Sequence, residues 1–470
     1  MKKTILSIML GLSFSASSYA DDLMTVYQLA VDNDPIINRA EAQKNSAYAA
    51  IDLSRASLLP QLSGSVSYTD STSEVFDQQI IEVDGVPRAF EFSGDNDTTT
   101  LNYGINLNMS LYDHANWLGL DRAELVAQQS DANLGSALQG LMQRTVTAYL
   151  AVLREQDNVE FVRAELRAIE RQLEQTKQRF EVGLTAITDV HEAQANFDNT
   201  VARQIRAENL VELRLEELRE ITSQYHDELF VLDTDKFTAV EPTPNNPSEW
   251  LEIAKDANLE LLAQRFAKDI AKENIDIARS GHLPTLALTG SYGINDRDSE
   301  TTLNPAVEGQ ESQTFVNDPP RLDNRSLTLR LNVPIYEGGS VSAQTEVARA
   351  DYVVASENLE LTYRQTVRTV RSSFNDVKAA ISTIRALEQS VVSAQSALQA
   401  TEAGFDVGTR TIVDVLNSTR NLFDARRNLA DARYNFITSI INLKRAAGTL
   451  TVADLQAINQ ALKPAPAEQN

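Results

Sequence analysis

The chain has 470 residues, of which 66 are acidic and 42 basic, and it contains no cysteine. The formal net charge of -24 argues against a nucleic-acid partner, which would favour a basic surface, and the lack of cysteine excludes disulfides and an N-terminal lipidated cysteine. The four histidines are scattered and no HExxH motif, phosphate-binding loop or catalytic constellation occurs, so we expect neither a metal nor a cofactor nor an enzyme.

The first 20 residues have the features of a secretory signal peptide. Lys2 and Lys3 precede an apolar stretch from Ile5 to Phe14, and small residues surround Tyr19 at the expected cleavage site. The apolar stretch is too short to cross a bilayer as a helix, and no longer one follows. We therefore expect an exported protein that begins at Asp21, with a net charge of -26 once the two lysines are removed.

Two segments of alternating polarity follow, at about 61–70 and 99–112. From Leu101 to Leu111 the odd positions are Leu, Tyr, Ile, Leu, Met and Leu, whereas the even positions are Asn, Gly, Asn, Asn and Ser. Each segment has about the length that a tilted strand needs to cross a bilayer. The acidic stretch from Thr69 to Thr100 is predicted to be a polar outer loop. A soluble, half-buried sheet would show the same alternation, but the signal peptide and the acidic loop favour the membrane.

A long helix is predicted from His114 to Phe180. No proline occurs between Arg88 and Glu241, and apolar residues recur at spacings of three and four from Leu134 onward. This spacing is typical of a coiled coil. Such a helix would be about 100 Å long at 1.5 Å per residue, which is too long for an ordinary globular domain.

The chain repeats itself at an offset of 224 or 225 residues. The sequence LPQL at Leu59 recurs as LPTL at Leu283, and FEVGLTAITDV at Phe180 recurs as FDVGTRTIVDV at Phe405. Echoes that share one order and one offset indicate a tandem duplication. We therefore predict a first repeat at 21–245, a second at 246–462 with strands at 285–294 and 326–336, and a disordered tail at 463–470.

The two echoed phrases are predicted to be tight turns between helices. Gly183 and Gly408 suit the left-handed position that ends a helix. Thr185 or Thr188 could cap the next helix in the first repeat, and Thr411 could do so in the second. Each repeat thus carries one helical hairpin with an exposed tip.

Four strands cannot close into a barrel, and an open edge in lipid leaves backbone groups unpaired. Two copies of the chain would give eight strands with a filled interior, whereas three would give twelve with room for water. The polar face of the strands is built from small residues, which favours the trimer: Asn102, Gly104, Asn106, Asn108, Thr328 and Asn332.

Several longer motifs resemble the TolC family of outer-membrane efflux proteins. They are RTVRSSF at Arg368, VVSAQSAL at Val391, VGTRTIVDVL at Val407 and LADARYN at Leu429. The resemblance implies a mixed α and β membrane protein, in which a homotrimer forms a 12-stranded outer-membrane β-barrel with four strands per protomer. A long periplasmic α-helical barrel would continue it, with a small mixed equatorial region at about 223–249 and after Gly448.

The same resemblance implies a function as an exit duct. Family members serve tripartite efflux pumps and type I secretion, and they work with a periplasmic adaptor protein and an inner-membrane transporter of the RND, ABC or MFS type, in contact with outer-membrane lipid. The alternative is a structural or adhesive coiled-coil surface protein, against which the duplicated strand pairs argue. A diffusion porin would need more strands per chain and no helices of this length.

The resemblance also implies a periplasmic gate at the hairpin tips. Arg410 would bind Asp189, Glu402 would bind Gln172, and a ring of three Asp414 carboxylates would favour cations. A carboxylate in the first turn of a helix is equally explained by the helix dipole. The implied gate residues are Gln172, Thr188, Asp189, Glu402, Phe405, Arg410, Asp414 and Asn417.

Two of these residues depart from the family pattern. Phe405 stands where the family usually has tyrosine, and Asn417 where it often has a second aspartate. We therefore expect a gate that depends more on Arg410 and blocks cations less. The implied adaptor-docking residues are Val182, Gly183, Leu184, Thr185, Val407, Gly408 and Thr409, although turn geometry alone explains the two glycines.

Overall fold

A computed structural model describes residues 21–305 and 311–464, which form two compact units. The described residues of the first unit are 21–44, 129–265 and 357–464, and those of the second are 45–128 and 266–356, apart from 306–310. The expected signal peptide at 1–20 lies outside the described residues.

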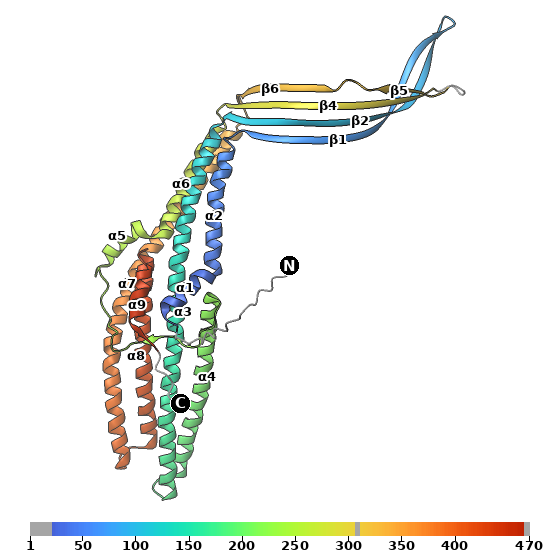
Figure 1. Ribbon diagram of the computed structural model, residues 1–470. Helices are drawn as coiled ribbons and strands as arrows, with labels where there is room; N and C mark the ends of the chain where they lie inside the picture. Colours follow the sequence, from blue (N-terminus) through green and yellow to red (C-terminus); the bar gives the residue numbers. More distant parts are fainter. Residues whose placement is uncertain (1–20, 306–310, 465–470) are drawn as a thin grey trace, which may run out of the picture. The chain divides into compact units, whose positions relative to one another are not determined.

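Apart from the short strand β5, the main elements follow the same order in the two halves of the chain, as a duplication requires (Figure 1). The first half contains α2 (Pro35–Ala56), β1 (Gln61–Val83), β2 (Val86–Tyr112), α3 (His114–Glu181) and α4 (Ile187–Thr222). The second contains α6 (Leu259–Ser280), β4 (Thr285–Pro305), β5 (Gln313–Asn317), β6 (Leu322–Asn332), α7 (Ser340–Asp406) and α8 (Ile412–Ala446). The predicted long helix is α3, whose 68 residues span about 100 Å.

The second unit contains one antiparallel sheet. β1 pairs with β2 and β2 with β4, while β6 and β5 pair with successive lengths of β4. The pairing of β1 and β2 continues from Gln61 opposite Asn108 to Val83 opposite Val86. The prediction of a polar loop from Thr69 to Thr100 is therefore wrong, because this segment is the outer part of a long hairpin.

The turn of this hairpin has a sequence signal that the loop prediction did not include. Asp84 and Gly85 have φ angles of 56° and 77°, the conformation of the two-residue turn that Asp-Gly sequences favour. The predicted strands were given only the length needed to cross a bilayer, so the Asp-Gly turn fell inside the predicted loop. In the second repeat, β6 covers Leu322–Asn332 rather than 326–336; Pro334 lacks an N–H for the ladder, so Tyr336 lies beyond the strand.

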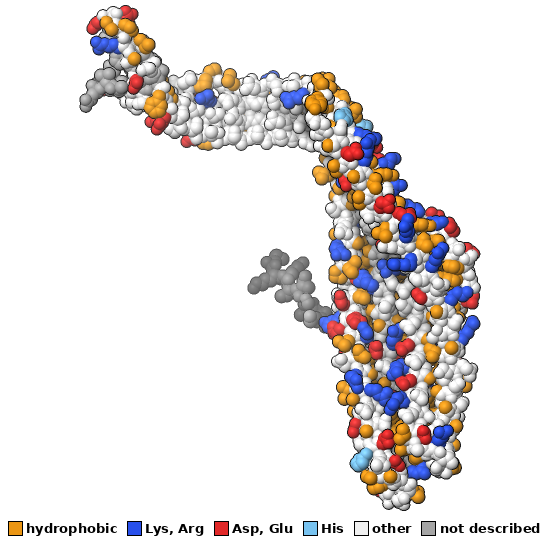
Figure 2. Space-filling view, turned by 180° about the vertical axis from the view of Figure 1, so that it is seen from behind, with side chains coloured by type: hydrophobic (Ala, Val, Ile, Leu, Met, Phe, Trp, Pro, Cys, Tyr) orange, Lys and Arg blue, Asp and Glu red, His pale blue; other side chains and the backbone are white. Residues whose placement is uncertain are grey.

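The sheet has one polar and one apolar face. The register places Asn108 opposite Thr289, and Thr289 opposite Thr328, on the polar face. Figure 2 shows one face of the sheet, on which charged side chains are sparse over the middle. On the other face, side chains are 62–76% exposed at Leu62, Val66, Leu327, Leu329 and Leu331. Among the described helices, none combines the length and apolar character needed to span a bilayer.

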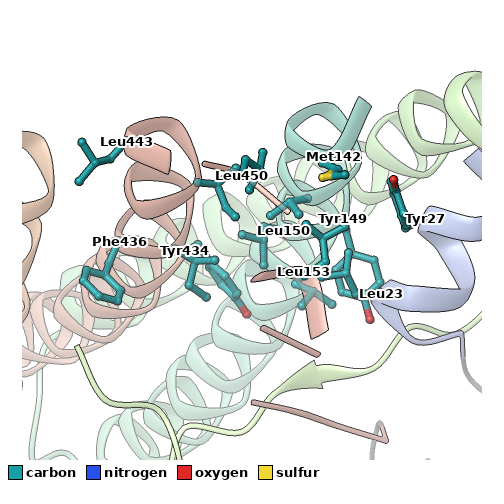
Figure 3. Close-up of a cluster of buried hydrophobic side chains, with 14 of the residues drawn as sticks. Leu23, Tyr27, Met142, Tyr149, Leu150, Leu153, Tyr434, Phe436, Leu443 and Leu450 are labelled. Carbon is teal, nitrogen blue, oxygen red and sulfur yellow. The ribbon is translucent and has the colours of Figure 1, made fainter. Parts of the chain in front are cut away.

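The hydrophobic core of the first unit lies where the long helices meet a belt of short elements (Figure 3). Tyr149, Leu150 and Leu153 of α3 and Tyr434 of α8 are at most 1% exposed. The belt comprises α1 (Leu23–Asn33), β3 (Val231–Leu232), α5 (Pro247–Ala257), α9 (Val452–Gln460) and β7 (Leu462–Lys463). The equatorial region predicted at about 223–249 and after Gly448 covers only part of this belt, because it does not include α1.

Both ends of the described chain are fixed in this belt. The Asp21 N–H donates to the Glu228 carbonyl at 2.8 Å, and the buried His226 ring nitrogen Nδ1 lies 2.7 Å from the Asp21 carboxylate. At the other end, Lys463 pairs with Val231 between β7 and β3. The predicted disordered tail therefore begins too early at 463, and its residues 465–470 lie outside the described part.

Candidate functional site at the helical tips

The first tip is a tight turn at the end of α3. Gly183 has a φ of 76°, its N–H donates to the Phe180 carbonyl at 2.9 Å, and the Leu184 N–H donates to the Arg179 carbonyl at 2.8 Å. These bonds satisfy carbonyls that the helix end would leave unpaired. The left-handed glycine predicted from the sequence is confirmed here.

The second tip repeats this geometry at the end of α7. Gly408 has a φ of 81°, its N–H donates to the Phe405 carbonyl at 3.0 Å, and the Thr409 N–H donates to the Gly404 carbonyl at 2.8 Å. The α3–α4 and α7–α8 hairpins lie side by side in the first unit, with their tips at the same end (Figure 1). At the tips, Val182, Leu184 and Val407 are 70–75% exposed.

The two helices that leave the tips begin differently. At α8, the Asp414 N–H donates to Thr411 Oγ1 at 3.3 Å and the Thr411 N–H donates to the Asp414 carboxylate at 3.0 Å, which forms the expected capping box. At α4 the N-cap is Ala186, with no side-chain bond, and the Thr185 hydroxyl donates to the Asp189 carboxylate instead. Of the predicted caps, only Thr411 is confirmed.

Asp414 is held in its ionised form by the same capping box. Hydrogen bonds from the Thr411 backbone and hydroxyl, and the nearby charge of Arg410, lower the pKa of Asp414 below its ordinary value. A negative charge is therefore present at this tip over the neutral pH range.

The other predicted gate residues lie on the same hairpins but are not joined within one chain. Thr188, Glu402 and Asn417 are exposed, while Nε2 of Gln172 is buried without a hydrogen-bond partner among the described residues. Within the described part of one chain, no hydrogen bond or ion pair joins Arg410 to Asp189 or Glu402 to Gln172. Both links between neighbouring hairpins stay predictions.

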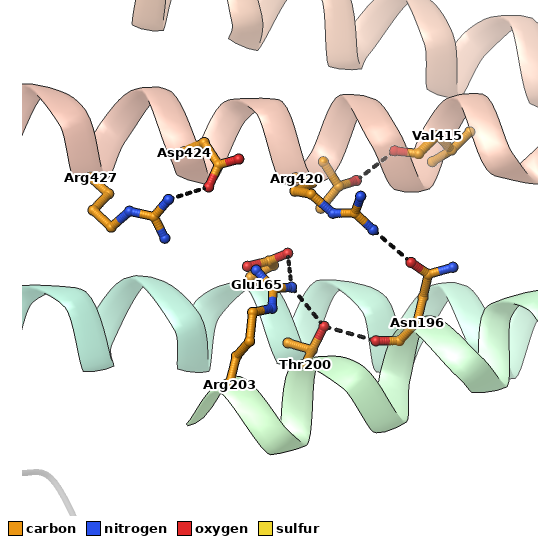
Figure 4. Close-up of polar contacts among 9 residues, drawn as sticks. Glu165, Asn196, Thr200, Arg203, Val415, Arg420, Asp424 and Arg427 are labelled. Carbon is orange, nitrogen blue, oxygen red and sulfur yellow. Dashed lines mark hydrogen bonds and ion pairs between the residues drawn. The ribbon is translucent and has the colours of Figure 1, made fainter. Parts of the chain in front are cut away.

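Polar contacts join the helices a few turns away from the tips (Figure 4). Within the first hairpin, Arg203 of α4 contacts the buried Glu165 of α3 at 2.6 Å. Between the hairpins, Arg420 of α8 donates to the Asn196 side-chain oxygen of α4 at 2.8 Å. The described residues include no group of three or more His, Asp or Glu side chains arranged to hold a metal ion.

The chain shows clear similarity to known proteins. The sequence profile described as "Outer membrane efflux protein" matches residues 26–224 and 250–449. "Outer membrane protein TolC" of Vibrio cholerae serotype O1 is 43% identical over 468 residues, which cover 99% of this chain and 100% of the relative. "Alkaline protease secretion protein AprF" of Pseudomonas aeruginosa is 28% identical over 94% of this chain and 87% of its own.

The fold also matches solved structures. A crystal structure of CusC, described in terms of transmembrane channel formation, superposes with a TM-score of 0.72 at 17% identity, and covers 92% of this chain and 93% of that one. At this identity the match shows a common fold.

Proposed function

Because the chain belongs to the outer membrane efflux protein family, we propose that its two helical tips form the inner gate of an outer-membrane exit duct. The protein is a channel and not an enzyme. It lies in the outer membrane, extends into the periplasm, and serves efflux and type I secretion. The observation that carries the gate is the matched geometry of the two tips.

The sheet would form a barrel from three copies of the chain. Its apolar side chains are exposed in the single chain, and such a surface suits lipid. In the described part of the sheet, β1 lies at one edge, and β6 together with the short β5 lies at the other. Backbone groups at an edge must be paired in a bilayer. Three copies give twelve strands around small polar residues, which suits a water-filled lumen.

The gate would be closed by links between hairpins of neighbouring copies. Arg410 would bind Asp189 and Glu402 would bind Gln172, whose buried amide nitrogen has no partner among the described residues of one chain. Three Asp414 carboxylates, ionised at neutral pH, would form a ring that favours cations.

The exposed tips would contact the partner proteins. The apolar side chains of Val182, Leu184 and Val407 lie beside the turn residues Gly183 and Gly408. We assign these tips to a periplasmic adaptor, which would connect the duct to an inner-membrane transporter.

Conductance of the purified protein in planar bilayers tests the duct, since an adhesive coiled-coil protein would form no channel.

For the gate, Arg410→Ala should raise the conductance of the resting channel, because it removes a charge-assisted link. An unchanged conductance would refute the assignment of Arg410. Cysteine introduced at Leu184 or Thr409 should crosslink to an adaptor in cells, whereas capture of no adaptor from either site would contradict docking there.

A further inference from the structure

One side chain at the end of α3 contacts the end of α7. The Arg179 guanidinium carbon lies 4.5 Å from the centre of the Phe405 ring, and its Nη1 lies 3.8 Å from Asp406 Oδ1. The side chain of Arg179 is 24% exposed and that of Asp406 is 66% exposed. A single cation therefore holds two consecutive residues of the other hairpin.

The Phe405 ring is itself fixed to the base of the second tip. It packs against a small cluster in which Ile169, Ile412 and Leu416 are each 2% exposed. Ile412 and Leu416 belong to the first two turns of α8. A contact that holds the ring therefore also holds the start of α8 and the turn before it.

The position of Arg179 along the hairpins is equally important. Among the described residues, the polar links between the hairpins include Asp157 with Tyr434 and Asn196 with Arg420. The Arg179 contact involves the last turn of α3 and the last turn of α7, and so lies nearest the tips. Movement of the second tip away from the first must break it.

We propose that Arg179 is a positioning residue of the gate, which holds the α7–α8 tip against α3 of the same chain through the Phe405 ring and the Asp406 carboxylate. This inference rests on the proposed function. An arginine over an aromatic ring and a partly exposed ion pair are both weak contacts. The tip is therefore held but can be released when the duct opens.

The test compares resting single-channel conductance of the full chain and its variants in planar bilayers. Arg179→Ala should shift the closed-to-open equilibrium about two- to fivefold toward the open channel. Arg179→Lys should cause a smaller shift toward the open channel than Arg179→Ala, because lysine keeps the cation. Phe405→Leu removes the ring face but keeps an apolar side chain. Its shift of the closed-to-open equilibrium should be smaller in the Arg179→Ala background than in the unmodified chain, because the two residues share one contact.

A matched control lies two turns earlier on the same helix. Arg171 is exposed, and among the described residues its Nε donates to the Arg167 carbonyl of its own helix. Arg171→Ala removes the same charge without a contact between hairpins, so its conductance should equal that of the unmodified chain. An equal rise in both alanine variants would overturn the inference, because it would indicate a general effect of charge.

Two further outcomes separate this inference from the proposed function. If the unmodified chain conducts and Arg179→Ala lowers only the unfolding temperature, Arg179 has a structural role and the inference fails while the duct stands. If the unmodified chain forms no channel and its deletion leaves drug sensitivity unchanged, the proposed function fails first.

Discussion

The same long helices are held in very different ways at the belt and at the tips. At the belt, α3 and α8 pack into a continuous core with α1 and α9, and Tyr149 donates to the Phe230 carbonyl at 2.8 Å. Near the tips, the corresponding cluster contains three buried side chains, and the polar contacts are partly exposed. A region with few buried contacts opens at a lower free energy than the core. The belt thus fixes the helices, and the tips can move without unfolding them.

The largest change in stability is expected when a buried leucine of the belt is truncated. Leu153 is 1% exposed, so Leu153→Ala should lower the free energy of unfolding by about 2–5 kcal/mol. The control is Leu184→Ala at the first tip, where the side chain is 71% exposed and the expected change is within about 0.5 kcal/mol. Denaturant unfolding of the purified protein measures both, and equal losses would break the comparison.

A charged group at the belt gives the next largest effect. Asp34 is 2% exposed, accepts from the N–H groups of Ile36 and Ile37, and contacts Arg144 at 2.8 Å. Asp34→Ala removes all three bonds and should cost about 1.5–3 kcal/mol. Asp34→Asn keeps an acceptor for the helix start and should cost less. An equal loss in the two variants would show that the charge, and not the cap, is decisive.

The pH dependence of this contribution follows from the pKa of Asp34. Burial would raise that pKa, but the hydrogen bonds from Arg144 and Ile37 outweigh it, so the pKa lies below its ordinary value. The stabilisation is therefore present above the unfolded pKa of about 4 and is lost as the pH falls through the folded value. Unfolding midpoints of the unmodified chain and Asp34→Ala should converge in strong acid.

Asp157 lies between the belt and the tips, and its contribution to stability should depend on pH in the opposite direction to that of Asp34. Burial and the negative charges of Glu160 and Asp431 raise the pKa of Asp157 to about 6, although Tyr434 donates to its carboxylate at 2.6 Å. Its stabilising contribution is complete below the unfolded pKa and is lost as the pH rises through about 6. Asp157→Asn should therefore stabilise the protein at pH 7.5 by about 1–2 kcal/mol after allowance for partial exposure.

The control for Asp157 is the same pair of proteins at about pH 3, below the unfolded pKa of about 4, where the carboxyl is protonated in both the folded and the unfolded state. There the difference in unfolding midpoint should disappear. An advantage of the asparagine variant that is the same at both pH values would show that packing, and not ionisation, causes it.

The helices and the turns between them could be predicted from the sequence because their signals are local. The helix predicted from His114 to Phe180 is α3, which ends at Glu181. The turns predicted at Gly183 and Gly408 lie between α3 and α4 and between α7 and α8. The outer hairpin was missed because its acidic composition is also typical of loops. The place of α1 depends on contacts with α4 and α9, which no periodicity encodes.

The site was predictable to the same extent. The left-handed glycines and the Thr411 cap follow from residues a few positions apart. The contact of Arg179 with Phe405 and Asp406 joins residues far apart in the chain. A cation in the last turn of a helix is ordinarily explained by the helix dipole, so only the packing of one hairpin on the other shows its second partner.

The last test concerns the second tip, where the Asp414 carboxylate could act in the helix cap, in an acidic ring, or in both. Asp414 completes the capping box of α8, so Asp414→Ala should lower the free energy of unfolding slightly, and Asp414→Asn by less. If three copies form an acidic ring, both variants should lose the same cation selectivity, measured as the reversal potential in a salt gradient. Because the pKa of Asp414 is lowered, the unmodified channel should keep this selectivity at neutral pH. Selectivity that survives in Asp414→Asn would restrict this carboxylate to the cap, and the tip would then differ from the belt in its stability alone.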